Sequence, residues 1–171
     1  MPVLNSQVPS LIESLKLSPH PEGGWYREVY RSDELITVNS LPDRFDSSHC
    51  FSTSIYYLLE SGDNSAFHRI KSDETWHFYL GSPLKLYLLY NDGTLQKVVL
   101  GDNPDAGHVF QFTVPRGVWF GAEVSVPESF SLLGCTVSPG FEFGDLEFAN
   151  LDDLIAGYGR YATLIRRLTR K

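Results

Sequence analysis

His68 and Glu74 are the two side chains of this sequence best suited to do chemistry, and both lie in the stretch GDNSAFHRIKSDETWHFYLG (62–81). An imidazole and a carboxylate can exchange protons with a substrate near neutral pH, and both can ligate a divalent metal. The polar tripeptide Lys71-Ser72-Asp73 between them predicts a tight hairpin of two short strands. We therefore expect His68 and Glu74 to point from rigid strands into one shared interior.

Aromatic residues alternate along the second of these strands. Trp76 and Phe78 share the parity of Glu74, whereas His77 has the opposite parity and would turn inward only at a β-bulge. The inward parity predicts an aromatic wall that could stack on the ring of a ligand. We expect Trp119 and Phe120, further along the chain, to add to this wall.

The rest of the pattern is that of a β-rich chain with helices at its two ends. Pro9 and the apolar residues after it predict a short helix, and Asn91-Asp92-Gly93-Thr94 predicts a hairpin. Roughly eight to ten short strands at near-regular spacing favour an antiparallel sandwich or barrel. The three- and four-residue spacing of apolar residues over 151–168 predicts two short helices, divided at Gly157 and Gly159, that pack outside the sheet.

Composition narrows the classes of function. A chain of 171 residues with 42% apolar and 20% charged residues fits one soluble globular domain. A net charge of −7 argues against nucleic acid, because phosphate backbones bind basic faces. With no membrane-spanning run and no secretory signal, we expect a cytoplasmic protein without membrane contact. Cys50 and Cys135 are expected to be reduced, unless the fold brings them together as one bridge.

The chain resembles the cupin superfamily, whose two signatures combine glycines, three histidines and one glutamate at fixed spacings. The first signature is matched at Gly62, His68, Glu74 and Gly81, and the second at Gly107, Pro115 and Gly117. Ile70 and Phe120 stand where the other two histidines would lie. Four separated blocks resemble the DUF985, or cupin-5, family over about residues 11–169, namely HPEGGWYREVYRS, STSIYYLL, FHRIKSDETWHFYLG and VPRGVWFGA.

This resemblance implies an all-β cupin fold, a double-stranded β-helix or jelly-roll barrel with short N- and C-terminal helices. It implies a single domain over 1–171, with the barrel at about 20–145 and the C-terminal helices at about 150–169. It also implies a homodimer. A cupin metal site uses three histidines and a glutamate, so only His68 and Glu74 would remain as ligands here. We therefore expect no cofactor, and a weakly held divalent metal is the alternative.

Three functions stay open on this reasoning. In the first, the barrel binds a small molecule such as a sugar or sugar nucleotide, and His68 is the acid or base of an isomerase or epimerase. Tyr57 would then return a proton to the opposite face, as implied by the resemblance to the metal-free epimerases of the superfamily. In the second, the protein binds a ligand or serves as a storage protein without catalysis. In the third, it is a divalent-metal enzyme of weak metal affinity.

The sequence also suggests positions or roles for four other polar residues. Arg69 or Arg116 could neutralise a phosphate or carboxylate of the ligand, although the parity of Arg69 places it toward solvent. His20 lies in the PHPEGG loop, where the match indicates a fixed backbone shape more than a ligand contact. His49 flanks a polar turn and is expected to be exposed.

Overall fold

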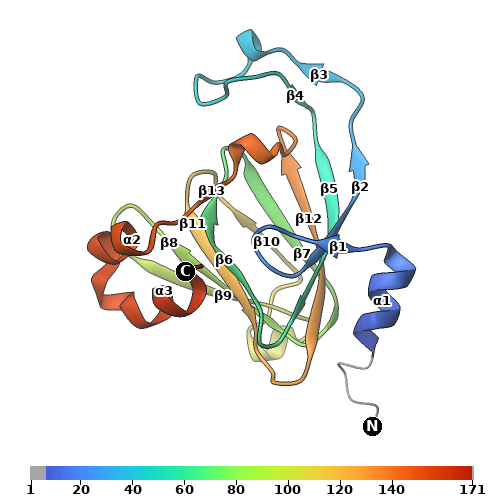
Figure 1. Ribbon diagram of the computed structural model, residues 1–171, viewed down its shortest axis with the longest axis vertical. Coiled ribbons are helices and arrows are strands. Elements are labelled where there is room, and N and C mark those ends of the chain that lie inside the picture. The colour runs from blue at the N-terminus through green and yellow to red at the C-terminus, as the bar shows by residue number, and fades with distance from the viewer. Residues whose placement is uncertain (1–6, 171) are drawn as a thin grey trace.

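Two antiparallel β-sheets form the body of the protein, whose computed structural model describes residues 7–170 (Figure 1). One sheet has the order β1 (Ser18–Pro19), β2 (Trp25–Arg31), β5 (Thr53–Glu60), β12 (Phe130–Ser138), β7 (Asp73–Gly81) and β10 (Gln111–Val114). The other has the order β13 (Glu147–Phe148), β6 (Asn64–Arg69), β11 (Trp119–Val124), β8 (Leu84–Leu89) and β9 (Leu95–Leu100). This arrangement confirms the predicted all-β, jelly-roll class.

The core lies between the two sheets because the inward residues of their strands are largely apolar. In β7, Trp76 and Phe78 face inward and are buried, whereas His77 lies on the other face, as its parity predicts. From the opposite sheet, Phe120 packs edge-on against Trp76, with ring centroids 6.1 Å apart. The predicted hairpin at 91–94 joins β8 to β9, and the positive φ of Gly93 fits its tight turn.

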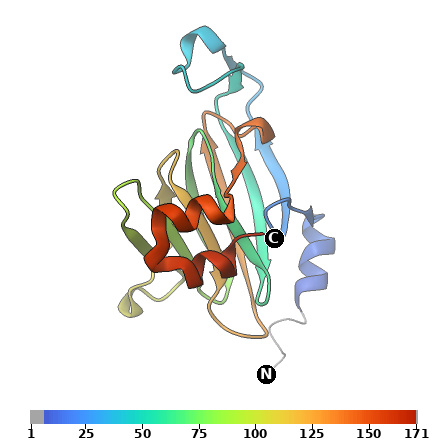
Figure 2. The same ribbon diagram turned by 60° about the vertical axis from the view of Figure 1, so that its left-hand side comes forward.

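Helices cover the outer faces of both sheets (Figures 1 and 2). The N-terminal helix α1 (Val8–Leu15) packs in a cluster with Leu58 and Phe130 of the six-stranded sheet. The C-terminal helices α2 (Leu151–Tyr158) and α3 (Ala162–Leu168) are joined by the 3₁₀ turn η5 (Gly159–Tyr161) and pack in a cluster with residues of the five-stranded sheet. The predicted helices at both ends are therefore confirmed.

A narrow arm projects beyond the sheets between β2 and β5 (Figures 1 and 2). It contains the strand pair β3 (Leu35–Ile36) and β4 (His49–Cys50), with the 3₁₀ turn η2 (Val38–Ser40) between them. Two further 3₁₀ turns, η3 (Pro104–Ala106) and η4 (Phe143–Asp145), lie in the body. Both cysteines are free and buried. Across residues 7–170, no helix is both long and apolar enough to cross a membrane.

The strands that carry His68 and Glu74 do not form the predicted hairpin. β6 pairs with β11 and β13, whereas β7 pairs with β12 and β10, so the two strands belong to different sheets. The polar tripeptide at 71–73 instead takes the chain from one sheet to the other. Alternation identifies each strand but not its partner, and this is why the sequence pattern suggested a hairpin. The consequence is that His68 and Glu74 belong to opposite walls of the interior.

Truncation of a core leucine should test the assigned interior. Leu59 is 0% exposed and packs among residues of both sheets. We expect Leu59→Ala to lower the free energy of unfolding by about 2–5 kcal/mol, because the change removes buried methyl groups and leaves a cavity. Urea denaturation measures this loss. The matched variant Leu35→Ala changes a residue that is 64% exposed on the arm and should shift the free energy of unfolding by less than about 0.5 kcal/mol. Equal losses in the two variants would contradict the assigned core.

Candidate functional site

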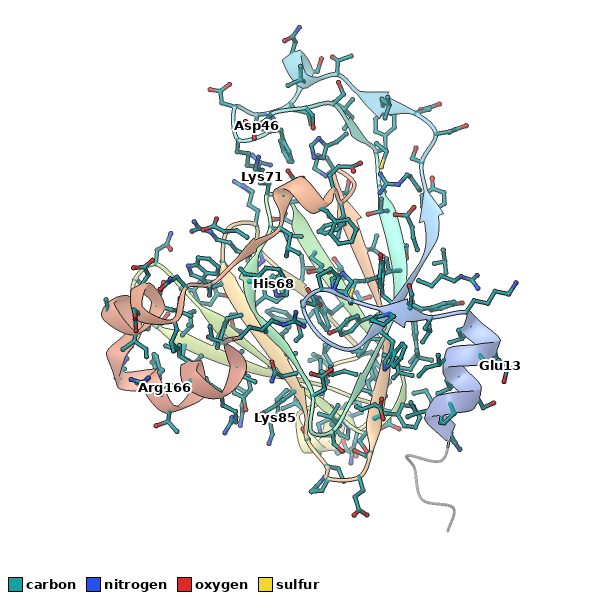
Figure 3. All side chains as sticks on the ribbon, in the orientation of Figure 1. Glu13, Asp46, His68, Lys71, Lys85 and Arg166 are labelled. Carbon is teal, nitrogen blue, oxygen red and sulfur yellow. The ribbon has the colours of Figure 1, made fainter. Side chains whose placement is uncertain are left out.

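A cavity of about 250 Å³ is lined by residues of both sheets, of the PHPEGG loop and of the segment after β12. Its polar lining consists of His20, Glu22, Glu28, Arg31, Thr53, His68, Glu74 and Cys135. Its apolar lining consists of Tyr26, Ile55, Ile70, Val137, Phe141 and Phe143. The predicted pair therefore meets in one cavity, and Figure 3 shows His68 inside the body of the molecule. Glu22, which the sequence did not single out, lines the cavity with them. So does His20, for which the sequence indicated a backbone role more than a ligand contact.

The direct partner of His68 is Glu22 rather than Glu74. His68 Nε2 lies 3.0 Å from Glu22 Oε2, and the two side chains are only 2% and 8% exposed. His68 Nδ1 lies 2.7 Å from the carbonyl oxygen of Ala66. Since both ring nitrogens face acceptors, the ring hydrogen-bonds fully only when it carries a hydrogen on each nitrogen. The geometry therefore describes an imidazolium paired with a carboxylate.

The electrostatics of the pair agree with this assignment. Burial alone would raise the pKa of Glu22, but the charge of His68 and its hydrogen bond lower that pKa to about 2. Burial alone would lower the pKa of His68, but the charge and hydrogen bond of Glu22 raise it. The other oxygen of Glu22 accepts a hydrogen bond of 3.2 Å from the hydroxyl of Ser65. Glu22 is thus ionised and fully engaged within the pair.

The PHPEGG loop holds Glu22 in place by lying directly against β6. The amide of Ala66 donates to the carbonyl of Glu22 at 2.9 Å, and the hydroxyl of Tyr57 donates to the carbonyl of Gly23 at 2.9 Å. A Cβ atom on Gly23 would lie 2.0 Å from the carbonyl oxygen of Asn64, and its φ is +121°. Only glycine permits this approach. The fixed backbone shape inferred from the sequence therefore also places a charged side chain beside His68.

Glu74 faces the same cavity as the Glu22–His68 pair and keeps its proton to unusually high pH. Burial and the negative charge of Glu22 raise the pKa of Glu74 to about 7, although the charge of His68 opposes this rise. Burial and the neighbouring Glu74 also raise the pKa of Cys135 well above its usual range, so this thiol stays protonated. The cavity thus contains a carboxyl group that can gain or lose a proton near neutral pH.

His20 brings a neutral imidazole to the cavity. Burial lowers its pKa, an effect that Glu22 opposes and His68 reinforces. The backbone N–H of Glu22 donates to His20 Nδ1 at 3.3 Å. This contact assigns the hydrogen of the neutral ring to Nε2. His20 can therefore donate a hydrogen bond without carrying a charge.

The predicted aromatic residues lie elsewhere in the fold. Trp76, Phe78 and Phe120 are buried in the core and are not among the residues that line the cavity. Trp119 lies on the outer side of β11, where the guanidinium of Arg69 stacks 4.4 Å from its ring. Tyr57 is buried, with its hydroxyl engaged by the PHPEGG loop, and burial raises its pKa well above the usual range. The ligand and catalytic roles given to these five residues stay predictions, and the geometry supports structural roles for them.

Other aromatic rings form the wall and the mouth of the cavity. Tyr26 packs edge-on against His20 with centroids 4.5 Å apart, and Phe141 and Phe143 come from the segment after β12. Phe143 is 51% exposed, so the opening lies on its side of the cavity. Arg31 holds this segment, because its guanidinium donates to Glu142 at 2.6 Å and to the carbonyl of Phe141 at 3.0 Å. No periodic pattern in the sequence marks this segment as part of a site.

The residues at the cupin ligand positions do not fit a metal ion. Ile70 and Phe120 are apolar at two of the four positions, and the ring of Phe120 lies 4.1 Å from the ring of His68. The Nε2 atom of His68 faces Glu22, so a metal would have to displace a buried ion pair. Within residues 7–170, no group of three or more His, Cys, Asp or Glu side chains is arranged to hold a metal. The chemistry derived below therefore uses no metal.

His49 is buried, contrary to the expectation from the sequence. It is 1% exposed, and its Nε2 lies 2.6 Å from the carboxylate of Asp145. The polar turn beside His49 belongs to the arm. The arm places β4, which carries His49, against η4, which carries Asp145. The pairing partner lies 96 residues away in the chain, so local sequence could not predict this contact.

The Glu22–His68 pair predicts a characteristic pH dependence of stability. The lowered pKa of Glu22 stabilises the fold fully above pH 4.5, and this stabilisation is lost as the pH falls toward about 2. A raised pKa of His68 gives stability that is present below 6.5 and lost as the pH rises through the folded value. We therefore expect Glu22→Gln to cost about 3–5 kcal/mol of unfolding free energy between about pH 4.5 and 6.5, and less on either side. Chemical denaturation across this pH range measures the difference from the wild type.

The exposed pair between Arg69 and Glu147 provides the control. Its two hydrogen bonds are 2.8 Å long, but Glu147 is 56% exposed. Glu147→Gln should therefore cost less than about 1 kcal/mol. A loss in Glu22→Gln as small as the loss in Glu147→Gln, or one that does not vary with pH, would contradict a charged buried pair.

Comparison with known proteins supports the fold and its extent. The chain is 39% identical to protein SO0799 of Shewanella oneidensis, with a TM-score of 0.84 over 94% of this chain and 96% of that one. It is 31% identical to a hypothetical protein from Leishmania major, with a TM-score of 0.85 over 95% and 98% of the two chains. The uncharacterized protein YML079W of Saccharomyces cerevisiae is 30% identical, and the match covers 90% of this chain and 80% of that protein.

Oxalate decarboxylase from Bacillus subtilis is similar in fold alone, at 15% identity and a TM-score of 0.54 over 90% of this chain and 37% of that one. The family described as "Cupin superfamily (DUF985)" matches residues 9–149. This match spans the cavity-lining residues from His20 to Phe143 and both sheets. The chain therefore belongs to the DUF985 family of the cupin superfamily.

Proposed function

We propose that this cupin is an enzyme that moves a proton on a small polar carbonyl compound such as a sugar, in an isomerisation or epimerisation. The observation that carries the proposal is the Glu74 carboxyl, with a pKa of about 7, in the same cavity as the ionised Glu22–His68 pair. Groups that transfer protons work best when their pKa lies near the operating pH. Strongly shifted pKa values within one cavity are typical of active sites.

The cavity favours a small, uncharged and polar ligand. Glu22 and His68 offset each other's charge, and so do Glu28 and Arg31. Glu74 is half protonated at about pH 7, and His20 is neutral. The three aromatic side chains Tyr26, Phe141 and Phe143 add an apolar wall. Hydroxyl and carbonyl groups against an aromatic wall match this lining. The volume of about 250 Å³ suits a compound of the size of a monosaccharide unit.

Each ionisable residue has a distinct part in the proposed reaction. The ionised form of Glu74 removes a proton from the carbon next to the carbonyl group, leaving an enolate. His20 donates its Nε2 hydrogen bond to the enolate oxygen, and a neutral imidazole paired with a carboxylate base is an established arrangement for this chemistry. Glu74, now a carboxylic acid, then returns the proton to carbon. His68, which the sequence suggested as the acid or base, stays an imidazolium because both of its ring nitrogens have acceptors inside the protein.

Binding without catalysis is the second candidate. It is favoured by the tight engagement of His68, whose two ring nitrogens already have acceptors inside the protein. In that case Glu74 and His20 would only hydrogen-bond the ligand. The two candidates differ in whether the bound compound exchanges hydrogen with solvent.

A deuterium exchange experiment tests the proposed reaction. Purified protein is incubated in D₂O with a panel of aldoses and ketoses, and proton NMR follows the hydrogen next to each carbonyl. We expect exchange with at least one compound, at a rate that rises as the pH passes through about 7 because only the ionised Glu74 is a base. Glu74→Gln should slow the exchange by about 10²-fold or more.

Glu13→Gln is the control, because it removes an exposed carboxylate of α1 at the far side of the molecule (Figure 3). It should leave the exchange rate unchanged. A compound that binds, seen as a raised melting temperature, but never exchanges hydrogen would support the binding protein instead. An exchange rate unaffected by Glu74→Gln would also refute the proposed base.

A further inference from the structure

A second concave site lies on the other side of the segment that forms the cavity mouth. This groove has a volume of about 580 Å³. Its walls come from the β6–β7 connection, the turn between β10 and β11, residues 144–147 and the arm. Phe141 and Phe143 line the cavity, whereas the residues that follow them line the groove. Ile70 contributes to both, so the two sites are neighbours.

Four cationic side chains converge on the groove although the chain as a whole is acidic. Arg44, Arg69, Lys71 and Arg116 line it, four of the 14 Lys and Arg residues in a protein of net charge −7. They come from three segments that are distant in sequence. Figure 3 shows Lys71 on the side of the body that faces the arm, next to Asp46.

Two of these cations already have carboxylate partners. Arg69 makes two parallel hydrogen bonds of 2.8 Å with Glu147. Lys71 contacts Asp46 of the arm and lies 3.6 Å from Asp145. The two carboxylates that line the groove are therefore already paired. Glu147 pairs with Arg69, and Asp145 contacts both Lys71 and His49.

The guanidinium groups of Arg44 and Arg116 keep free donors. Arg44 donates its Nε–H to the carbonyl of Lys71 at 2.8 Å and stacks 4.6 Å from the ring of Phe45. These contacts fix its plane, and it has no carboxylate partner within residues 7–170. Arg116 is 57% exposed and lies 4.0 Å from Asp73, at the limit of an ion pair. That carboxylate also accepts the backbone N–H of Arg116 at 2.8 Å.

We propose that this groove is a phosphate-binding site, in which Arg44 and Arg116 grip the phosphate from two sides. Guanidinium forks match the geometry of phosphate oxygens, and charge-assisted hydrogen bonds of this kind are about twice as strong as neutral ones. Gly117 and Gly144 line the groove without side chains, so a tetrahedral anion can approach the backbone there. Lys71 adds positive charge at the side of the groove that faces the arm.

The phosphate has two possible sources, because the groove adjoins the cavity. It belongs either to the ligand whose carbon skeleton occupies the cavity, or to a separate phosphate compound. The proposal rests on the groove alone and does not depend on proton transfer in the cavity.

Isothermal titration calorimetry with inorganic pyrophosphate at low ionic strength tests the groove. The wild-type protein should bind pyrophosphate, and added salt should weaken the binding. Arg44→Gln and Arg116→Gln should each raise the Kd about tenfold, because each loses a charge-assisted contact. Arg44→Lys, which keeps the charge but not the fork, should bind with an intermediate Kd.

Arg160→Gln is the matched control, because Arg160 is an exposed arginine of η5 whose guanidinium donates to the carbonyl of Gly93 outside the groove. It should change the Kd less than about twofold. No binding of pyrophosphate to the wild type, or an equal Kd in Arg44→Gln, Arg116→Gln and Arg160→Gln, would overturn the proposal.

Glucose 6-phosphate and glucose distinguish the two sources. If the phosphate is part of the cavity ligand, glucose 6-phosphate should have a lower Kd than both pyrophosphate and glucose. Arg116→Gln should then raise the Kd of glucose 6-phosphate to that of glucose. If the phosphate comes from a separate compound, the sugar should add no affinity. Either result supports a phosphate-binding site in the groove. Glu74→Gln should abolish proton transfer but leave the Kd of pyrophosphate unchanged, whichever source is correct.

Discussion

The buried pair between Glu22 and His68 is the interaction on which the site depends. Its two side chains come from different parts of the chain, the PHPEGG loop and β6, and both are almost fully removed from water. Burying one charge alone would be costly, so each residue requires the other. Burial raises the pKa of Glu74, and the negative charge of Glu22 adds to this rise, so that carboxyl keeps its proton to about pH 7. The ion pair thus contributes to the protonation of the group that shares its cavity.

The fold makes this arrangement possible by placing β6 and β7 in opposite sheets. A hairpin would put His68 and Glu74 on one wall as near neighbours. The crossing between sheets instead places them on different walls of one cavity. The glycines of the PHPEGG loop complete the geometry, because the loop must lie against the backbone of β6 to bring Glu22 within reach. Backbone topology and one close approach therefore create the site.

The sequence predicted the fold class, the terminal helices and the shared cavity of His68 and Glu74, because these follow from local periodicity and signature spacing. It did not reveal the role of Glu22, although the HPEGG block was one of the matched segments. The identity of an ion-pair partner depends on which loop folds over which strand, and that is a tertiary contact. The same limit explains why Trp76 and Phe120 were predicted as ligand walls. Their inward parity is real, but parity does not distinguish a packed core from the lining of a cavity.

In this chain a buried ion pair lies where the cupin signatures would place metal ligands. Ile70 and Phe120 remove two ligands, and Glu22 supplies a negative charge to the histidine that remains. The most direct test is ¹⁵N NMR of the imidazole nitrogens of His68 at about pH 6, with His68→Gln used to assign the signals. The account predicts that both nitrogens carry hydrogen, with chemical shifts of an imidazolium. A neutral His68 with one bare nitrogen at that pH would contradict it.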